Sequence, residues 1–289
     1  MTLEEAYTQG KKILEEAGIG DAGLDALYIL MEVCRIDKAY YLAHGNDEVK
    51  VTCEDSREND YFALVRRRAE HIPLQHILGY TEFMGLRFNV SSDVLIPRQD
   101  TETLVEEALK HLHDGMKILD MCTGSGCILI SLLNYSNDCT GVGADISAEA
   151  LKVAEGNYRA LLSGRNDTDC SFVLSDLYEN IEGRFDLIIS NPPYIRTDVI
   201  GTLAPEVKDH DPFIALDGGQ SGLEFYKKIT DGLDDHLIPG GTVLFEIGYD
   251  QGDDVSAMLK DKGYIDVKVI KDYSGNDRVA MGVRSCLTD

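Results

Sequence analysis

The fold is decided by Lys117-Ile118-Leu119-Asp120-Met121-Cys122-Thr123-Gly124-Ser125-Gly126-Cys127. An apolar strand ends here in an acidic residue, passes through a loop with two glycines, and leads into a helix expected at about 126–134. Glycines let the backbone turn sharply and approach a ligand without a Cβ in the way. The start of the next helix adds free amide donors. This order of elements predicts a cofactor site at the edge of a sheet.

The flanking sequence extends this strand–loop–helix unit into a larger alternating pattern. Further strands are expected at about 139–145, 170–174, 185–190, 241–247, 264–270 and 278–284, and further helices at about 147–161, 222–236 and 251–261. Alternation of this kind predicts an α/β fold with a parallel, doubly wound sheet that holds its ligand at the C-terminal ends of the strands. The last two strands have no helix between them, so one of them is expected to be antiparallel.

The region before this pattern is predicted to be helical as far as about residue 77. Apolar residues follow helical spacing after Asp21, a plausible N-cap, and another helix is expected from about 54 to 70. The run Arg66-Arg67-Arg68 in that helix is either a solvated face or a docking patch for an acidic partner. Residues 82–90 have the pattern of a β-hairpin with Gly85 near its turn. The predicted domains are 1–77, a linker at 78–98, and 99–289.

Composition narrows the possible partners and the compartment. The 289 residues carry a net charge of -24, which repels phosphate backbones and favours a cationic cofactor or a basic partner surface. There is no apolar run long enough for a membrane span and no apolar core of a signal peptide. The seven cysteines are odd in number and form no CxxC pair, so a reduced, cytoplasmic protein is expected. We expect no metal site, and interpret His111 and His113 as exposed residues near a helix end.

Residues after the next two strands complete the predicted cofactor site. Asp145 ends the second strand, where a carboxylate can accept both hydroxyls of a ribose. A nicotinamide dinucleotide would use the same geometry, but Leu129 replaces a third glycine and Asp120 would place negative charge close to a pyrophosphate. A carboxylate suits a sulfonium, so S-adenosylmethionine is favoured. Asp176 either meets the adenine amine or only caps a loop, and Leu177 can pack on the ring.

Asn191-Pro192-Pro193-Tyr194 follows the strand at 185–190 and should reach the same edge of the sheet. Two prolines make this segment rigid. A planar NH2 group has two donors, and the Asn191 side-chain oxygen and the Pro192 backbone oxygen can accept both. Tyr194 can stack on the planar group and attract the sulfonium. The segment therefore predicts methylation of a planar nitrogen, although alone it can also be a strand-terminating turn.

With these motifs in place, the chain resembles the release factor glutamine methyltransferases, called PrmC or HemK, over nearly its whole length. The resemblance also rests on Gln75–Gly79, Phe83–Leu86, Val94–Arg98, Thr101-Glu102, Ala215–Gly219, Glu246–Gly248 and Gly275–Arg278. It implies a helical domain that helps hold the substrate protein, a β-hairpin linker, and a Rossmann-like class I methyltransferase domain. It also implies methyl transfer from S-adenosylmethionine, with S-adenosylhomocysteine as product, to the glutamine of the Gly-Gly-Gln loop of class I release factors.

The family's functional residues map onto matching positions of this chain. The predicted cofactor-binding residues are Asp120, Cys122, Thr123, Gly124, Ser125, Gly126, Asp145, Asp176, Leu177 and Asn191. Asn191, Pro192, Pro193 and Tyr194 are the predicted substrate-binding residues, and Asn191, Pro192 and Tyr194 the catalytic ones.

Three positions depart from the family pattern. Cys122 stands where a glycine is usual, Gln99 where a proline is common, and Leu177 where an aromatic residue is frequent. The Cys122 side chain predicts a backbone φ below zero at that position.

Other activities remain open at this point. The same chemistry on a ribosomal protein glutamine is the nearest alternative. An adenine N6 methyltransferase would need a basic groove and a base-flipping pocket, which the net charge of -24 disfavours. A cofactor-binding protein without catalysis is disfavoured by the intact Asn191–Tyr194 segment. We expect a monomer without nucleic-acid or membrane partners.

Overall fold

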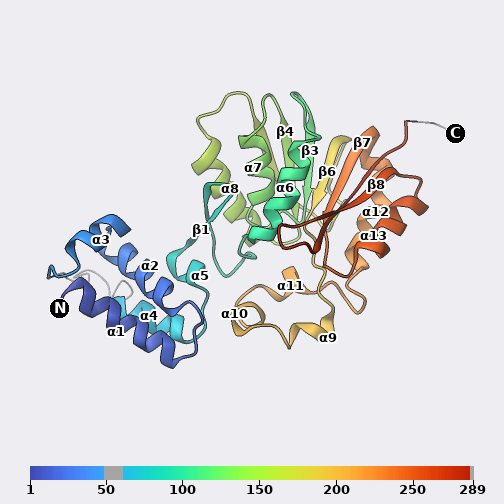
Figure 1. The fold of residues 1–289 in the computed structure, drawn as a ribbon. Coiled ribbons are helices and arrows are strands. Elements are labelled where there is room, and N and C mark those ends of the chain that lie inside the picture. The colour runs from blue at the N-terminus through green and yellow to red at the C-terminus, as the bar shows by residue number, and fades with distance from the viewer. Residues whose placement is uncertain (49–60, 287–289) are drawn as a thin grey trace. The chain divides into compact units, whose positions relative to one another are not determined.

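The computed structural model describes residues 1–48 and 61–286 (Figure 1). The chain forms two compact units, which are Met1–Gly79 with Ala204–His210, and Tyr80–Leu203 with Asp211–Asp289. Cys53 and the first part of the helix predicted at 54–70 lie outside the described residues. Among the described helices, none combines the length and the apolar character that crossing a membrane requires.

The first unit is helical, as predicted. Its elements are α1 (Leu3–Glu16), α2 (Ala22–Cys34), α3 (Lys38–His44), α4 (Tyr61–Ala69), α5 (Leu74–Leu78) and α10 (Pro205–Lys208). Thr2 and Glu5 form a capping box that starts α1. The core is formed by fully buried apolar side chains, among them Leu14, Leu30 and Tyr61. Asp21 occupies the N-cap position of α2, as predicted, but its side chain makes no cap hydrogen bond.

The three consecutive arginines of α4 have different environments. Arg66 and Arg67 are exposed, as either interpretation of the run required. Arg68 is only 8% exposed, and its guanidinium donates to Asp25 at 2.7 Å and to Glu206 at 3.2 Å. Arg68 therefore connects α4 to α2 and to the segment 204–210 within this unit. The three arginines do not form one exposed patch, because Arg68 is buried.

The second unit begins with the predicted β-hairpin of β1 (Tyr80–Phe83) and β2 (Leu86–Asn89). The two turn residues, Met84 and Gly85, both have positive φ, at 50° and 70°. A two-residue turn in which both residues have positive φ matches the right-handed twist of the strands that it joins. Phe83 and Phe88 point into the core of this unit, so the hairpin packs as part of it.

Seven strands form the central sheet in the order β5-β4-β3-β6-β7-β9-β8. They are β3 (Lys117–Met121), β4 (Thr140–Asp145), β5 (Asp169–Leu174), β6 (Phe185–Ser190), β7 (Leu237–Glu246), β8 (Ile265–Lys271) and β9 (Asp277–Val283). The first five pair in parallel, whereas β9 runs antiparallel to both β7 and β8. The predicted doubly wound sheet with one antiparallel strand is confirmed.

Helices cover both faces of this sheet (Figure 1). One layer holds α6 (Glu102–Leu109), which follows the short 3-10 turn η2 (Gln99–Thr101), then α7 (Cys127–Asn134) and α8 (Ala148–Leu162); the other holds α12 (Glu224–His236) and α13 (Gly252–Asp261). Between β6 and α12 lie the four-residue helices α9 (Thr197–Ile200) and α11 (Phe213–Leu216). The chain reverses its winding direction between β3 and β6, and a ligand site is expected at that point.

Candidate active site

The glycine loop after β3 is held by hydrogen bonds to its neighbours. The Thr123 amide donates to the Ala144 carbonyl at 3.0 Å, and the Gly126 amide donates to the Thr123 carbonyl at 2.8 Å. Cys122 has a φ of 61°, so the prediction of a negative φ is wrong. The chain must turn at once from β3 into the loop, and this turn imposes the left-handed conformation. A side chain in that conformation costs roughly 1–2 kcal/mol.

Gly126 has a packing role at the start of α7. Its φ is 79°, and a Cβ on it would lie 2.9 Å from Ile130 Cδ1 and 3.1 Å from Ala154 Cβ. The absence of a side chain therefore lets α7 and α8 approach each other. Gly124, with a φ of 55°, has no atom within 4 Å of an ideal Cβ, so its backbone faces open space.

Asp120 lies beneath this loop and is fully buried. Its Oδ2 accepts a hydrogen bond from the Thr123 hydroxyl at 2.6 Å, while Oδ1 has no hydrogen-bond partner among the described residues. Burial raises the pKa of this carboxyl to about 7. In this structure Asp120 supports Thr123, and a direct contact with a cofactor stays a prediction.

An Asp120→Asn variant should become more stable relative to the wild type as the pH rises from 4 to 7. The folded-state pKa of about 7 lies above the value of ~3.9 expected in the unfolded chain. The contribution of Asp120 to stability is therefore present below the unfolded pKa and is lost as the pH rises through the folded pKa. Urea unfolding of both proteins between pH 4 and 8 measures the difference. A difference that stays constant over this range would contradict the assignment.

Asp145 ends β4 and lies beside the glycine loop. Its Oδ2 accepts a hydrogen bond from the Gly124 amide at 2.9 Å, and its Oδ1 accepts one from the Ser147 amide at 2.9 Å. Each oxygen keeps a further lone pair for another donor. Burial raises the pKa of this carboxyl, and the amides of Ser147 and Gly124 act in the opposite direction.

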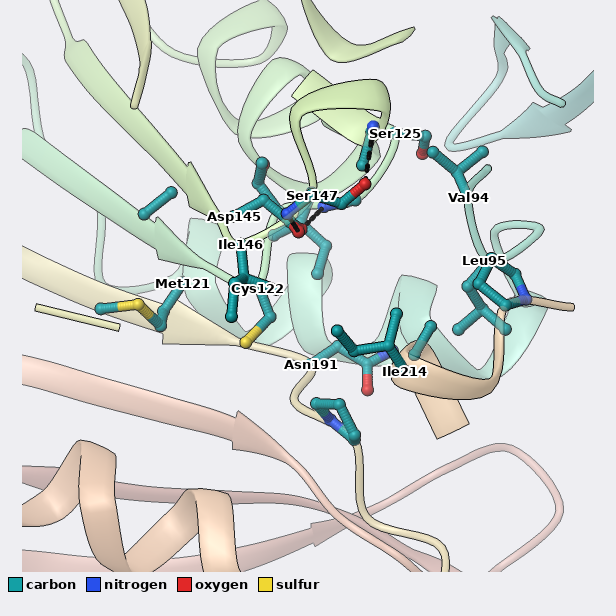
Figure 2. A pocket seen from close by; sticks show the side chains of 18 of the residues that line it. Val94, Leu95, Met121, Cys122, Ser125, Asp145, Ile146, Ser147, Asn191 and Ile214 are labelled. Atoms are coloured by element: carbon teal, nitrogen blue, oxygen red, sulfur yellow. Dashed lines mark hydrogen bonds between the residues drawn. The ribbon is translucent and has the colours of Figure 1, made fainter. Parts of the chain in front are cut away.

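A cavity opens over the C-terminal ends of β3, β4 and β6 within the second unit. It is lined by Asp93, Val94, Leu95, Pro97, Arg98, Thr101, residues 121–125, Cys127, Ile128, residues 144–147, Ala150, residues 175–177, Asn191, Pro193, Pro212, Ile214, Ala215, Phe225 and Lys228. Figure 2 shows Asp145 and Ser147 at one end, Asn191 and Ile214 at the other, and Val94 and Leu95 along a third side.

Most of the residues predicted from the sequence meet in this cavity. Cys122, Thr123, Gly124, Ser125, Asp145, Asp176, Leu177, Asn191 and Pro193 line it, whereas Asp120, Gly126, Pro192 and Tyr194 do not. The cavity is also lined by residues that were not predicted from the sequence, among them Asp93, Val94, Leu95, Pro97, Arg98, Ile214, Phe225 and Lys228. The stretch Val94–Arg98 belongs to the sequence block that resembles the family, and this block is the signal that could have identified it. Ile214, Phe225 and Lys228 belong to no motif, so no sequence signal marks them.

Tyr194 lies against the core rather than along the cavity. Its hydroxyl donates to Glu246 Oε1 at 3.3 Å, and its ring packs with the apolar residues between the sheet and α12. Burial raises the pKa of the phenol. The predicted stacking of Tyr194 on a substrate stays a prediction, since in this structure the ring is directed toward Glu246.

Glu246, at the end of β7, is only 2% exposed. Burial raises the pKa of its carboxyl to about 7, and the charge of Arg278 and a hydrogen bond from Tyr194 act in the opposite direction. Its Oε2 has no hydrogen-bond partner among the described residues. Thr101 accepts a hydrogen bond from Asn191 Nδ2 at 3.4 Å. This bond connects Asn191, which follows β6, to the turn η2.

The segment 191–194 is fixed from the other side by the loop at 216–222. The Gly218 amide donates to the Ile195 carbonyl at 2.8 Å, and the Ile195 amide donates to the Leu216 carbonyl at 3.1 Å. Gln251 Nε2 donates to the Tyr194 carbonyl at 3.0 Å. These bonds hold the backbone around the two prolines in one position.

The charges around the cavity favour a cation over a polyanion. Its lining includes the carboxylates of Asp93, Asp145 and Asp176, and its cations are Arg98 and Lys228. Arg98 is ion-paired with the buried Asp211. Phosphate groups need unpaired donors and cations, so a diphosphate would fit poorly. The lining therefore suits a cationic cofactor better than one that carries a diphosphate.

Comparison with known proteins places both units in described families. Residues 5–79 match the model of the PrmC N-terminal domain, and residues 98–204 match that of the methyltransferase small domain. A protein of Agrobacterium fabrum named release factor glutamine methyltransferase is 41% identical over 96% of this chain and 96% of its own length. A protein of the same name from Clostridium acetobutylicum is 36% identical over 99% of this chain and 100% of its own length.

Solved structures support the fold. A methyltransferase from Pyrococcus furiosus superposes with a TM-score of 0.54 and 20% sequence identity, over 76% of this chain and 98% of that chain. The predicted Rossmann-like class I methyltransferase fold is confirmed.

Proposed function

The chain belongs to the release factor glutamine methyltransferase family, and on this premise we propose that it methylates the side-chain amide nitrogen (N5) of the glutamine in the Gly-Gly-Gln loop of class I peptide chain release factors. The methyl donor is S-adenosylmethionine and the product S-adenosylhomocysteine. The observation that carries the proposal is the position of Asn191, whose side chain lines the same cavity as the glycine loop and Asp145.

Asn191 and Pro192 bind and orient the substrate amide in this proposal. The Asn191 side-chain oxygen and the Pro192 carbonyl accept the two protons of the amide group, which raises the electron density on a nitrogen whose lone pair is otherwise delocalised. Their rigid placement supplies most of the acceleration, since well-oriented groups reach effective molarities of about 10⁵ M or more. No strong base is required, because the N-methylated product can lose its proton afterwards.

The cofactor occupies the other end of the cavity in this proposal. S-adenosylmethionine supplies an electrophilic methyl group on a sulfonium. Asp145 accepts hydrogen bonds from the ribose hydroxyls, Asp176 faces the adenine amine, and Leu177 packs on the ring. Residues 122–125 approach the methionine part through their backbone, which is open at Gly124.

An Asp145→Ala variant should bind the cofactor at least tenfold more weakly. It removes the acceptor for the ribose and also frees the amides of Gly124 and Ser147, so the loss should exceed the ~1 kcal/mol of one ordinary hydrogen bond. Calorimetric titration with S-adenosylhomocysteine measures the affinity. Asp186→Ala is a matched control, because Asp186 also accepts a backbone amide, from Lys117, but lies outside the cavity lining. Equal affinities of both variants would contradict the role of Asp145.

The two parts of the chain divide the work in this proposal. Residues 1–77 hold the release factor, residues 78–98 link the two domains, and residues 99–289 carry out methyl transfer. The net charge of -24 suits a substrate protein with a basic surface. The protein acts as a cytoplasmic monomer without direct contact with nucleic acid or membrane.

Labelled S-adenosylmethionine tests this function when it is supplied in parallel with a purified release factor, ribosomal proteins and adenine-containing DNA. We expect label on the glutamine of the Gly-Gly-Gln loop. Replacing that glutamine in the release factor should remove the label. Label on DNA or on a ribosomal protein, with none on the release factor, would overturn the proposed substrate.

A further inference from the structure

Two short elements of the second unit hold the segment 191–194 in place. The first is the turn η2, where Thr101 Oγ1 accepts a hydrogen bond from Asn191 Nδ2 at 3.4 Å. The second is the loop at 216–218, which follows α11 and forms two backbone hydrogen bonds with Ile195, at 3.1 and 2.8 Å. The position of the segment therefore depends on the positions of both elements.

An ion pair between Arg98 and Asp211 joins these two elements. Arg98 directly precedes η2, and its guanidinium donates a hydrogen bond to a carboxylate oxygen of Asp211. Asp211 begins the stretch that leads through α11 to the loop at 216–218. The Asp211 side chain is fully buried, whereas that of Arg98 is 41% exposed. A buried carboxylate is costly when no cation compensates it, so Asp211 is held against Arg98.

The ion pair completes a closed ring of contacts. Arg98 and Thr101 belong to one stretch of the chain, Asp211 and the loop at 216–218 belong to another, and the segment 191–194 is bonded to both. Arg98 and Thr101 also line the cavity. A stretch that is attached at one point only can still shift, and closing the ring removes that freedom. Such precision affects catalysis, because a displacement of about 1 Å can cost about a hundredfold in rate.

We propose that Arg98 and Asp211 are positioning residues for methyl transfer, which act as one pair to hold the segment 191–194 where its acceptors meet the substrate nitrogen. The inference rests on the proposed function, because that function places the substrate amide at Asn191 and Pro192. The pair acts through the segment and not on the methyl donor. It therefore governs the rate of transfer more than the affinity for the cofactor.

A double-mutant cycle with Arg98→Met, Asp211→Asn and the combination of both tests the inference. We expect each single variant to lower kcat by about tenfold, a coupling of the size found for residues of one ion-pair network. Either change breaks the same pair, so the double variant should lose about as much as one single variant. Two independent residues would instead multiply their losses to about a hundredfold. KM for the release factor should stay within about threefold of the wild type.

The affinity for S-adenosylhomocysteine, measured by calorimetry, should also stay within about threefold. The stoichiometry of the same titration counts the folded sites, and kcat is expressed per folded site, so loss of folding does not count as loss of rate. Asp211→Asn strands no buried charge, because the partly exposed Arg98 can turn toward solvent.

Glu107→Gln is the matched control. Glu107 is also a buried carboxylate paired with an exposed cation, since its Oε2 lies 2.6 Å from Lys110 Nζ, but neither residue lines the cavity. This variant should keep kcat within about twofold of the wild type. A loss as large as that of Asp211→Asn would show that breaking any such ion pair slows the enzyme, and would overturn the inference.

The cycle itself gives two further outcomes against the inference. Losses in kcat that multiply in the double variant overturn it, as do single variants with kcat within twofold of the wild type. A fall in cofactor affinity as large as the fall in kcat also overturns it, because the pair would then serve the cofactor. If the wild-type enzyme labels a different protein, the proposed substrate is wrong, but the cycle can be measured on that protein, so the two failures are distinguished.

Discussion

An Asn191→Ala enzyme should lose turnover by about 10²–10³-fold, the loss typical for removal of one preorganised group that stabilises a transition state. Asn191 is placed by the end of β6 and by its hydrogen bond to Thr101, and its side chain lines the cavity opposite Asp145. In the variant the substrate amide has one acceptor fewer, so its nitrogen is neither aligned nor enriched in electron density. The affinity for S-adenosylhomocysteine should change little, because Asp145 and the glycine loop remain.

Single-turnover methylation with excess enzyme gives the rate of transfer, and calorimetry gives the cofactor affinity. Asn166→Ala serves as a control, since Asn166 is exposed and lies outside the cavity lining. If Asn191→Ala transfers methyl groups within a few-fold of the wild-type rate, Asn191 does not bind the substrate amide as proposed.

Much of the second unit could be predicted because its signals are periodic and local. Apolar strands alternate with amphipathic helices along the chain, and the missing helix between the last two strands predicted that one of them is antiparallel, which is β9. The parallel sheet then brings the ends of β3, β4 and β6 to one edge, so Cys122, Asp145 and Asn191 line one cavity although they are far apart in sequence. The short helices α9, α10 and α11 escaped prediction, since four residues contain no amphipathic repeat.

The direction of individual side chains could not be predicted. Asp120 lies one residue before the end of β3 and Asp145 is the last residue of β4, yet Asp120 is enclosed beneath the loop and Asp145 lines the cavity. Tyr194 follows two cavity residues but turns toward Glu246, because a buried carboxylate provides an acceptor there. These side-chain orientations depend on groups that come from distant parts of the chain, so no local sequence pattern predicts them.

The segment 204–210 is a second feature that escaped prediction. It lies between β6 and α12 in the sequence, but it packs with the helical unit, where Glu206 accepts hydrogen bonds from Arg68 and contacts His71 at 3.1 Å. Of the three consecutive arginines, Arg68 is the one that makes this contact, together with His71. The sequence alone does not distinguish Arg68 from its two exposed neighbours.

A Gly218→Ala enzyme should lose about tenfold to a hundredfold in kcat, although Gly218 lies outside the cavity lining. A Cβ at this position would lie 2.7 Å from Tyr194 Cα, 2.8 Å from Pro193 O and 2.8 Å from Tyr194 C. All three atoms belong to the backbone of the segment that carries Asn191, and two prolines make that segment rigid. The extra methyl group must therefore displace the catalytic segment as a whole, because no flexible side chain can move aside.

The cofactor end of the cavity should respond much less to this change, because Gly218 contacts the segment 191–194 and not the glycine loop. Kinetics at saturating cofactor, calorimetry with S-adenosylhomocysteine and thermal unfolding together separate a displaced segment from a protein that no longer folds. Gly201→Ala is the matched control, since an ideal Cβ there has no atom within 4 Å and its φ of -61° suits alanine. Equal activity of the two variants would show that the backbone of 191–194 tolerates displacement, and that its rigid position contributes little to methyl transfer.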